Sequence, residues 1–249
     1  MEEDALKIFP SEKINLLYAG CGPGAPLILP LLSHFNSEQL FITLLDINES
    51  SIHSIKTLIK SLELDLYFRD IILIDATQYI HPKDIPLHIV LSETMDKGLT
   101  KEPQVRITQN LAPQLIEGGI FIPEEIEIYT EHTFYSKEPY FDIYKNVLDI
   151  GNSIPTINKQ TLFTITKTIA KEPPFNFESN WIEVPNNVED TPDISIVANV
   201  KIYKDQILIK GESLISNPYC VTSLSAIKGK KYKLRHSTEG IPNWKFIEA

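Results

Sequence analysis

The sequence predicts an α/β protein in which a parallel sheet covered by helices occupies residues 1–125 and a smaller β-rich domain occupies residues 126–249. Three observations support this division. An apolar run at residues 14–24 ends in closely spaced glycines, as a buried strand does where it turns toward a helix. Apolar runs then alternate with segments of helical periodicity, which is typical of a parallel sheet with helices on both faces. Beyond Pro123 most segments alternate with period two, which indicates antiparallel strands.

Five short apolar runs in the first half predict the strands of the parallel sheet. They span residues 14–19, 40–45, 71–74, 87–91 and 120–122. Between them, apolar residues recur at three- and four-residue spacing or on nearly every side, which predicts helices. These helices are expected at residues 25–35, where Pro30 should introduce a kink, at 49–62 and at 103–115. The polar residues 1–13 contribute part of one helical turn.

Period-two segments predict the strands of the second half. They span residues 126–129, 194–202, 206–215 and 228–235. A short turn at Lys204-Asp205 joins the second of these strands to the third. Residues 135–160 show no clear period, so a helix there stays open. We therefore expect a β-rich second domain with one undecided segment.

Composition and charge narrow the class of protein. The 249 residues are 43% hydrophobic and 22% charged, as in a soluble globular protein, and no run of 18 apolar residues predicts a membrane span. The start, Met1-Glu2-Glu3-Asp4, lacks the positive charge of a secretory signal, and the two cysteines, Cys21 and Cys220, predict no disulfide framework. We expect a cytoplasmic protein. A net charge of −10 disfavours nucleic acid as a partner and suits a cationic substrate, although solubility alone also explains it.

The glycine turn has the features of a cofactor-binding loop. Gly20, Gly22 and Gly24 lack a Cβ atom, so the backbone can adopt positive φ and a ligand can approach it closely. Their G-x-G-x-G spacing differs from the dinucleotide fingerprint, and the absence of a following lysine disfavours a phosphate-rich ligand. An ordinary strand-to-helix turn is the alternative interpretation.

Two acidic residues follow the next strands, at the sheet edge where open α/β proteins bind ligands. Asp46 lies 22 residues after Gly24 and could accept hydrogen bonds from both hydroxyls of a ribose. Asp75 follows the third strand and could bind an adenine amino group. Capping of the next helix is the alternative role for Asp46.

The stretch from Ser92 to Glu102, Ser-Glu-Thr-Met-Asp-Lys-Gly-Leu-Thr-Lys-Glu, resembles the double-glutamate loop of protein arginine methyltransferases. That loop runs Ser-Glu-x-Met and reaches a second Glu at the same spacing. The glycine turn, Ala-Gly-Cys-Gly-Pro-Gly, is similar to the family's S-adenosylmethionine loop, and residues 118–123 are similar to its fifth strand and the proline that follows. The resemblance covers residues 14–129.

This resemblance implies a class I S-adenosylmethionine-dependent methyltransferase with a Rossmann-like first domain and a barrel-like second domain. The implied cofactor is S-adenosyl-L-methionine. Around it the resemblance places Gly20, Cys21, Gly22, Gly24, Asp46, Ile47, Asp75, Ala76 and Glu93. It makes Glu93 and Glu102 the catalytic pair, places Met95 and Trp244 beside the acceptor, and implies a homodimer.

The chemistry of a guanidinium acceptor supports two carboxylates in this loop. A methyl group on a sulfonium is transferred by in-line displacement, so a lone pair of the acceptor must be held on line with the methyl carbon. Guanidinium is charged and delocalised at ordinary pH. Two carboxylates can bind its N–H groups, concentrate its charge and leave one nitrogen more nucleophilic. Without the resemblance, a cap at Glu93 and a solvated first-turn acid at Glu102 would be the simpler interpretation.

Several positions depart from the family pattern. Thr94 stands where the family usually has Trp, and Asp96 where it usually has Gly. The family's paired tyrosines are not found before residue 14, and its dimerisation arm could only lie within residues 135–160. Asn243-Trp244-Lys245 is similar to the family's Thr-His-Trp loop but lacks the His. These differences leave room for a small cationic molecule, such as free arginine or another amine or guanidine, as well as an arginine-containing peptide.

Other functions stay open on the sequence. The six histidines show no metal-ligand spacing, so no metal site is predicted. An O- or C-methyltransferase of a small-molecule pathway would use the two glutamates as base or orienting groups. A binding module of the same fold without catalysis would use the β-rich half as a protein-contact surface.

Overall fold

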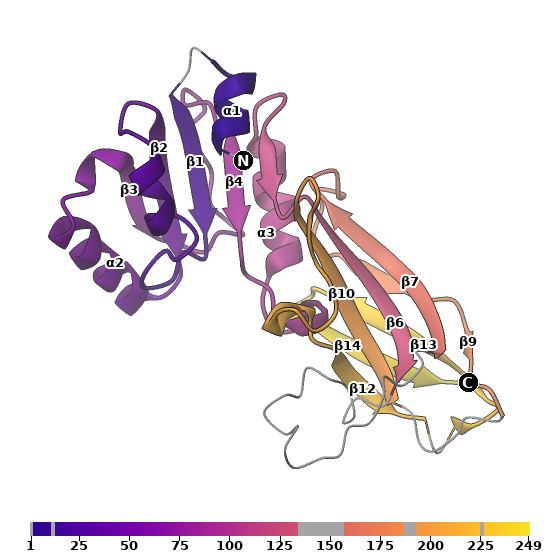
Figure 1. The fold of residues 1–249 in the computed structure, drawn as a ribbon. Coiled ribbons are helices and arrows are strands. Elements are labelled where there is room, and N and C mark those ends of the chain that lie inside the picture. Colours follow the sequence, from indigo (N-terminus) through magenta and orange to yellow (C-terminus); the bar gives the residue numbers. More distant parts are fainter. Residues whose placement is uncertain (1, 11–12, 134–156, 187–192, 225–226) are drawn as a thin grey trace. The chain divides into compact units, whose positions relative to one another are not determined.

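The chain packs as two units in the computed structural model, which describes residues 2–10, 13–133, 157–186, 193–224 and 227–249 (Figure 1). The first, here called the sheet unit, comprises Met1–Thr94, Arg106–Glu124 and Thr166–Lys171. The second, here called the β-rich unit, comprises Met95–Val105, Glu125–Ile165 and Glu172–Ala249. Residues 95–105 therefore pack with the β-rich unit, although the sequence analysis assigns them to the first domain. The domain boundary after residue 125 stays a prediction.

Five parallel strands form the sheet unit, in the order β3-β2-β1-β4-β5 (Figure 1). Their bounds are β1 Ile14–Ala19, β2 Leu40–Asp46, β3 Phe68–Leu73, β4 Ile89–Ser92 and β5 Ile120–Ile122. All six residues of β1 are buried, as expected for a central strand covered on both faces. The prediction of a Rossmann-like parallel sheet is confirmed.

Strand register brings the ends of the central strands to one edge of the sheet. Ala19, the last residue of β1, pairs with Leu45 on β2 and with Ser92 on β4. The chain therefore leaves these strands at the same level. Gly20 and Glu93 follow β1 and β4 directly, and Asp46 is the last residue of β2. This edge is where ligands bind in open α/β sheets.

Helices flank the sheet at most of the predicted places. They are α1 Glu2–Ile8, α2 Glu49–Ser61 and α3 Gln104–Leu111, the last followed by a 3₁₀ helix at Ala112–Gln114. Helix α2 buries the stripe of Ile52, Ile55 and Ile59 that its spacing predicts. On α3, Ile107 and Leu111 pack in a core cluster with side chains of β1, β2, β4 and β5.

The α-helix predicted at residues 25–35 does not form. A shorter 3₁₀ helix, Leu29–His34, occupies its second half. Pro23, Pro26 and Pro30 have no backbone N–H, and each proline ring also crowds the carbonyl one turn before it. An α-helical hydrogen-bond ladder therefore cannot run through this stretch.

Two antiparallel sheets make up the β-rich unit, and β10 and β13 are their central strands. The first has the order β11-β10-β6-β7 with β12 also on β10, and the second has the order β14-β13-β8 with β9 also on β13. Their bounds are β6 Glu125–Thr133, β7 Ile157–Thr166, β8 Asn176–Glu178, β9 Ile182–Glu183, β10 Asp193–Tyr203, β11 Gln206–Leu208, β12 Tyr219–Ser223, β13 Lys231–Ser237 and β14 Asn243–Glu248. The predicted β-rich second half is confirmed.

Two boundaries in this unit differ from the sequence analysis. The strand predicted at residues 206–215 ends at Leu208, and a 3₁₀ helix at Leu214–Ser216 follows. Gly211 adopts φ +87°, which no extended strand accommodates, and the Ser213 and Ser216 side chains form a capping box that starts the 3₁₀ helix. The helix considered for residues 135–160 lies largely outside the described residues, and the chain is extended as β7 from Ile157.

Candidate active site

The glycine turn is tied to the end of β2 by its backbone. The N–H groups of Gly20 and Cys21 both donate to the Leu45 carbonyl, at 2.9 and 3.1 Å. The Gly22 N–H donates to Asp46 Oδ2 at 2.8 Å. Gly20 and Gly22 adopt φ of +76° and +61°, in the left-handed region that favours glycine. The turn and the acidic residue that the sequence singled out are therefore brought together.

The three glycines of this turn have different surroundings. A Cβ on Gly20 would lie 2.4 Å from Thr94 Cγ2 and 3.3 Å from the Glu93 carbonyl oxygen. A Cβ on Gly22 or Gly24 would meet no atom within 4 Å. Gly20 thus allows the turn to pack against the segment after β4, whereas Gly22 and Gly24 face open space that a ligand can enter.

Asp46 organises this edge with both carboxylate oxygens. Oδ2 accepts from Gly22, and Oδ1 accepts from the Asn48 N–H at 2.8 Å. Asn48, rather than Asp46, is the N-cap of α2, because its side chain accepts from the N–H groups of Ser50 and Ser51. A carboxylate oxygen has more than one lone pair, so each oxygen of Asp46 can still accept a hydroxyl proton.

The remaining predicted cofactor residues of the sheet unit also follow strands β2 and β3. Asp75 Oδ1 accepts from the Thr77 N–H at 2.8 Å, which forms a tight turn after β3. Ile47, which follows β2, is 75% exposed, whereas Ala76, which follows Asp75, is buried. Ile47 thus presents an apolar side chain to solvent directly after Asp46.

Two buried polar side chains stand close to these carboxylates. Burial, followed by the charge of Asp46, raises the pKa of the Cys21 thiol to about 12. Burial, followed by the charge of Glu93, also raises the pKa of Tyr18. Tyr18 was not among the predicted site residues. Its only signal in the sequence is a polar hydroxyl in the apolar second half of the strand, two residues before the first glycine.

Residues 95–105 carry the second predicted glutamate and belong to the β-rich unit. Asp96 Oδ2 pairs with Lys101 Nζ at 3.0 Å. Burial is the largest single effect on Asp96 and opposes its ionisation. The hydrogen bonds from Lys101 and from the Lys97 N–H, together with the charges of both lysines, outweigh burial and lower the pKa of this carboxyl. Partial burial, and after it the negative charge of Asp96, raises the pKa of Glu102. The Asp that replaces the expected Gly therefore changes the charge around Glu102.

The two predicted acceptor residues are both buried in the β-rich unit. Met95 is 4% exposed and Trp244 is 7% exposed. The Trp244 indole N–H donates to the Gly98 carbonyl at 2.6 Å, so it already has a partner within the protein. Glu93, in contrast, is an exposed residue of the sheet unit.

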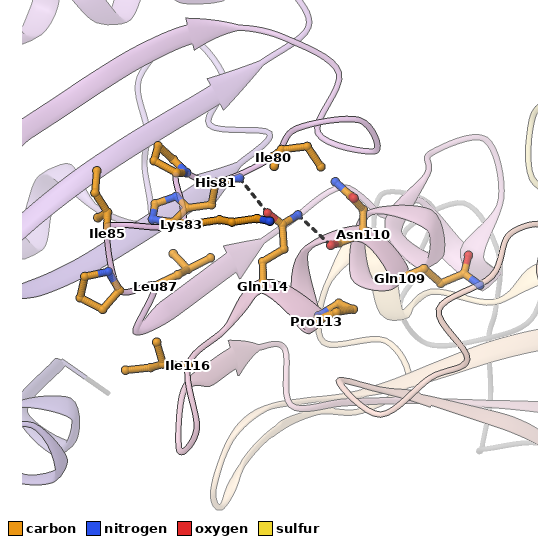
Figure 2. A pocket seen from close by; sticks show the side chains of 12 residues that line it. Ile80, His81, Lys83, Ile85, Leu87, Gln109, Asn110, Pro113, Gln114 and Ile116 are labelled. Carbon is orange, nitrogen blue, oxygen red and sulfur yellow. Dashed lines mark hydrogen bonds between the residues drawn. The ribbon is translucent and has the colours of Figure 1, made fainter.

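A pocket elsewhere in the sheet unit contains none of the predicted site residues (Figure 2). Its volume is about 560 Å³, and its walls come from residues 80–87 and from the end of α3. Gln114 holds this region together, because its side chain accepts from the His81 N–H at 2.7 Å and donates to the Asn110 carbonyl at 2.9 Å (Figure 2). We assign this hollow no ligand.

Two kinds of feature are absent from the described part of the chain. Within it, no group of three or more His, Cys, Asp or Glu side chains is arranged to hold a metal ion. Likewise, none of its helices is long and apolar enough to cross a membrane.

The parallel sheet and the β-rich unit make up a fold that is also found in solved structures of arginine methyltransferases. PRMT6 in complex with SAH is 10% identical, with a TM-score of 0.61 over 100% of this chain and 95% of that chain. Arabidopsis thaliana Protein Arginine Methyltransferase 10 is 12% identical, with a TM-score of 0.58 over 99% and 92%.

A third structure, the Trypanosoma brucei PRMT1 enzyme–prozyme heterotetrameric complex with AdoHcy, is 10% identical, with a TM-score of 0.51 over 99% of this chain and 93% of that chain. No protein-family model matches the sequence. No curated protein matches it either. At these identities the likeness shows the fold alone. A proposal about activity therefore rests on the residues of the site.

Proposed function

We propose that this protein is an S-adenosylmethionine-dependent N-methyltransferase that acts on a guanidino or amine nitrogen. The observation that carries the proposal is the Gly22 N–H to Asp46 hydrogen bond, which joins the glycine turn to the end of β2. Glu93 follows β4 at the same edge. The fold shared with arginine methyltransferases, two of them solved with SAH or AdoHcy, supports the same cofactor.

The residues of this edge fit S-adenosylmethionine. Gly22 and Gly24 leave open the space that a Cβ would fill, so the cofactor can lie against the backbone. Asp46 would accept from the ribose hydroxyls and Asp75 from the adenine amino group. Gly20, Cys21, Ile47, Ala76 and Glu93 would complete the contacts. The cofactor supplies a methyl group on a positively charged sulfur, which an acceptor lone pair can displace.

Glu93 and Glu102 are the proposed acceptor-binding pair. As carboxylates they can accept the N–H groups of a guanidinium, localise its charge and leave one nitrogen more nucleophilic. Met95 and Trp244 would support this site with buried apolar surface, because the Trp244 N–H is already donated to Gly98. A net charge of −10 favours a cationic acceptor, either a small molecule or an arginine-containing peptide. A homodimer and a cytoplasmic location are further predictions.

Transfer of labelled methyl groups from S-adenosylmethionine tests this function. The acceptors are free arginine, an arginine-rich peptide, small amines and small hydroxy acids. We expect label on a guanidino or amine nitrogen, and a loss of kcat of about a hundredfold or more in Glu93→Gln and Glu102→Gln. Glu117→Gln, which removes a charge from an exposed position of the sheet unit, is the matched control and should retain activity.

The result also separates the alternatives. Label found only on oxygen or carbon acceptors would replace the proposal with another methyltransferase activity. Tight binding of the cofactor product without any transfer would favour a binding module. Failure to bind S-adenosylmethionine or its product would contradict the proposal at its first step.

A further inference from the structure

The backbone just before Glu102 is held in an unusual conformation. Gly98, Leu99 and Lys101 all have left-handed φ values, of 64°, 57° and 64°. Such values are unfavourable for Leu and Lys, which carry a Cβ. Leu99 and Thr100 are also buried, at 1% and 4% exposure. Surrounding contacts must therefore maintain this shape, because the local sequence does not favour it.

Three hydrogen bonds from the β13–β14 hairpin maintain it. The Trp244 indole N–H donates to the Gly98 carbonyl at 2.6 Å. His236 Nε2 lies 3.0 Å from the Leu99 carbonyl oxygen, and the Lys101 N–H donates to the Pro242 carbonyl at 2.9 Å. All of these residues belong to the β-rich unit. Each bond satisfies a main-chain group that the turn itself leaves unpaired.

His236 makes its bond as a neutral ring with one defined tautomer. A carbonyl oxygen can only accept, so Nε2 carries the hydrogen. Nδ1 is buried and has no hydrogen-bond partner among the described residues. Phe163, Phe175 and Trp244 surround the ring, with centroid distances of 5.8, 6.1 and 4.9 Å. Burial lowers the pKa of His236, which keeps the ring neutral.

A buried imidazole with one nitrogen that lacks a hydrogen-bond partner lowers stability, whereas a phenylalanine ring would fill the same space without an unsatisfied polar atom. The Nε2–H bond to Leu99 is what distinguishes His236 from a phenylalanine at this position. Glu102 directly follows Lys101 in the chain, so the conformation of the left-handed turn sets the direction in which the Glu102 side chain leaves the backbone.

We propose that His236 is a positioning residue for Glu102, acting through the Leu99 carbonyl. The proposal rests on the function proposed above, in which Glu102 binds the acceptor. Loss of the Nε2–H donor leaves the Leu99 carbonyl buried and unsatisfied, and the turn relaxes toward more favourable φ values. Glu102 then misaligns the acceptor without altering the cofactor residues of the sheet unit.

Three variants test this role. His236→Phe keeps a ring and removes the donor, and His236→Gln offers an amide nitrogen in place of Nε2. His132→Phe is the matched control, because His132 is also buried in the β-rich unit but bonds to the Tyr232 hydroxyl at 2.9 Å. Two quantities are measured in the full-length chain: steady-state methyl transfer, and hydrogen exchange of the Lys101 amide.

We expect His236→Phe to lower kcat by about 10- to 100-fold while KM for S-adenosylmethionine stays within about twofold. The Lys101 amide should exchange faster in this variant. His236→Gln should recover much of both, and His132→Phe should change neither. Equal kcat and equal Lys101 exchange in His236→Phe and His132→Phe would overturn the proposal. If the wild-type protein transfers no methyl group, the proposed function fails, and the exchange comparison alone decides whether His236 holds the turn.

Discussion

Replacing Gly20 with alanine probes the packing of the glycine turn directly. At φ +76° an alanine costs about 1–2 kcal/mol relative to glycine, partly offset by about 0.4–1 kcal/mol because the unfolded chain loses freedom. The new Cβ would also lie 2.4 Å from Thr94 Cγ2, and overpacking of this kind costs about 1–3 kcal/mol. We expect Gly20→Ala to lower the free energy of unfolding of the sheet unit by about 2–4 kcal/mol.

The other two glycines provide a graded comparison. Gly22→Ala places a Cβ on a residue with positive φ but brings it into no clash, so it should lower the free energy of unfolding by about 1 kcal/mol. Gly24→Ala has neither cost and should stay within about 0.5 kcal/mol of the wild type. Both new methyl groups would enter the open space, so we expect them to weaken binding of the cofactor product more than they affect stability. Urea unfolding followed by circular dichroism and calorimetric titration measure the two effects.

A double-mutant cycle isolates the clash. Thr94→Ser removes Cγ2 but keeps the hydroxyl that lies 3.1 Å from Ser92 Oγ. In that background Gly20→Ala should recover about 1–2 kcal/mol of its cost. Fluorescence of the two tryptophans, Trp181 and Trp244, reports separately on the β-rich unit. The reasoning is refuted if Gly20→Ala costs no more than Gly24→Ala, or if the Thr94→Ser background changes nothing.

Three further predictions concern charge and burial. Asp46→Asn should weaken binding of the cofactor product about tenfold or more, because the charge-assisted hydrogen bonds from Gly22 and from the ribose become neutral ones. Calorimetric titration measures this affinity, and an unchanged value would exclude Asp46 from the site. Cys21, with a pKa of about 12 against the ordinary 9.0, should react with iodoacetamide at pH 8 about a thousandfold more slowly than a free thiol until the protein is denatured. Burial lowers the pKa of His132 from 6.5 to about 4. As pH falls, the His132 imidazole therefore binds a proton in the unfolded chain before it does so in the folded protein. The free energy of unfolding, measured by urea unfolding, should fall by about 2 kcal/mol between pH 7 and pH 5, and it should fall by less in the His132→Gln variant.

The sheet edge that carries the predicted cofactor residues could be predicted from the sequence because its signals are local. Gly20, Asp46 and Glu93 each stand at the end of an apolar run, and parallel strands place such ends together. The strand order could not be predicted in the same way, because the crossover rules fix the handedness of each connection and leave several orders of five strands allowed. The helix expected at residues 25–35 was wrong for an equally local reason, because Pro26 and Pro30 each remove a backbone N–H and together interrupt the helix, whereas a kink was expected at Pro30 alone.

The support of Glu102 could not be predicted, because it depends on contacts between distant parts of the chain. Leu99 and His236 are 137 residues apart, and Gly98 and Trp244 are 146 apart. Short strands such as β8 and β9, of three and two residues, carry too few positions to show a period. Sequence alone therefore predicts which carboxylates act in the site and leaves open which contacts hold the turn before Glu102.

The division of contacts predicts that the proposed cofactor binding and the proposed acceptor alignment are separable by mutation. Gly22 and Asp46 bond to each other within the sheet unit, whereas the turn before Glu102 bonds to His236 and Trp244 within the β-rich unit. A substitution in the hairpin should therefore lower kcat at constant affinity for the cofactor, and a substitution in the glycine turn should do the reverse. The same division places the Asp96–Lys101 ion pair within the β-rich unit, so we expect the Asp that replaces Gly to act on the charge around Glu102.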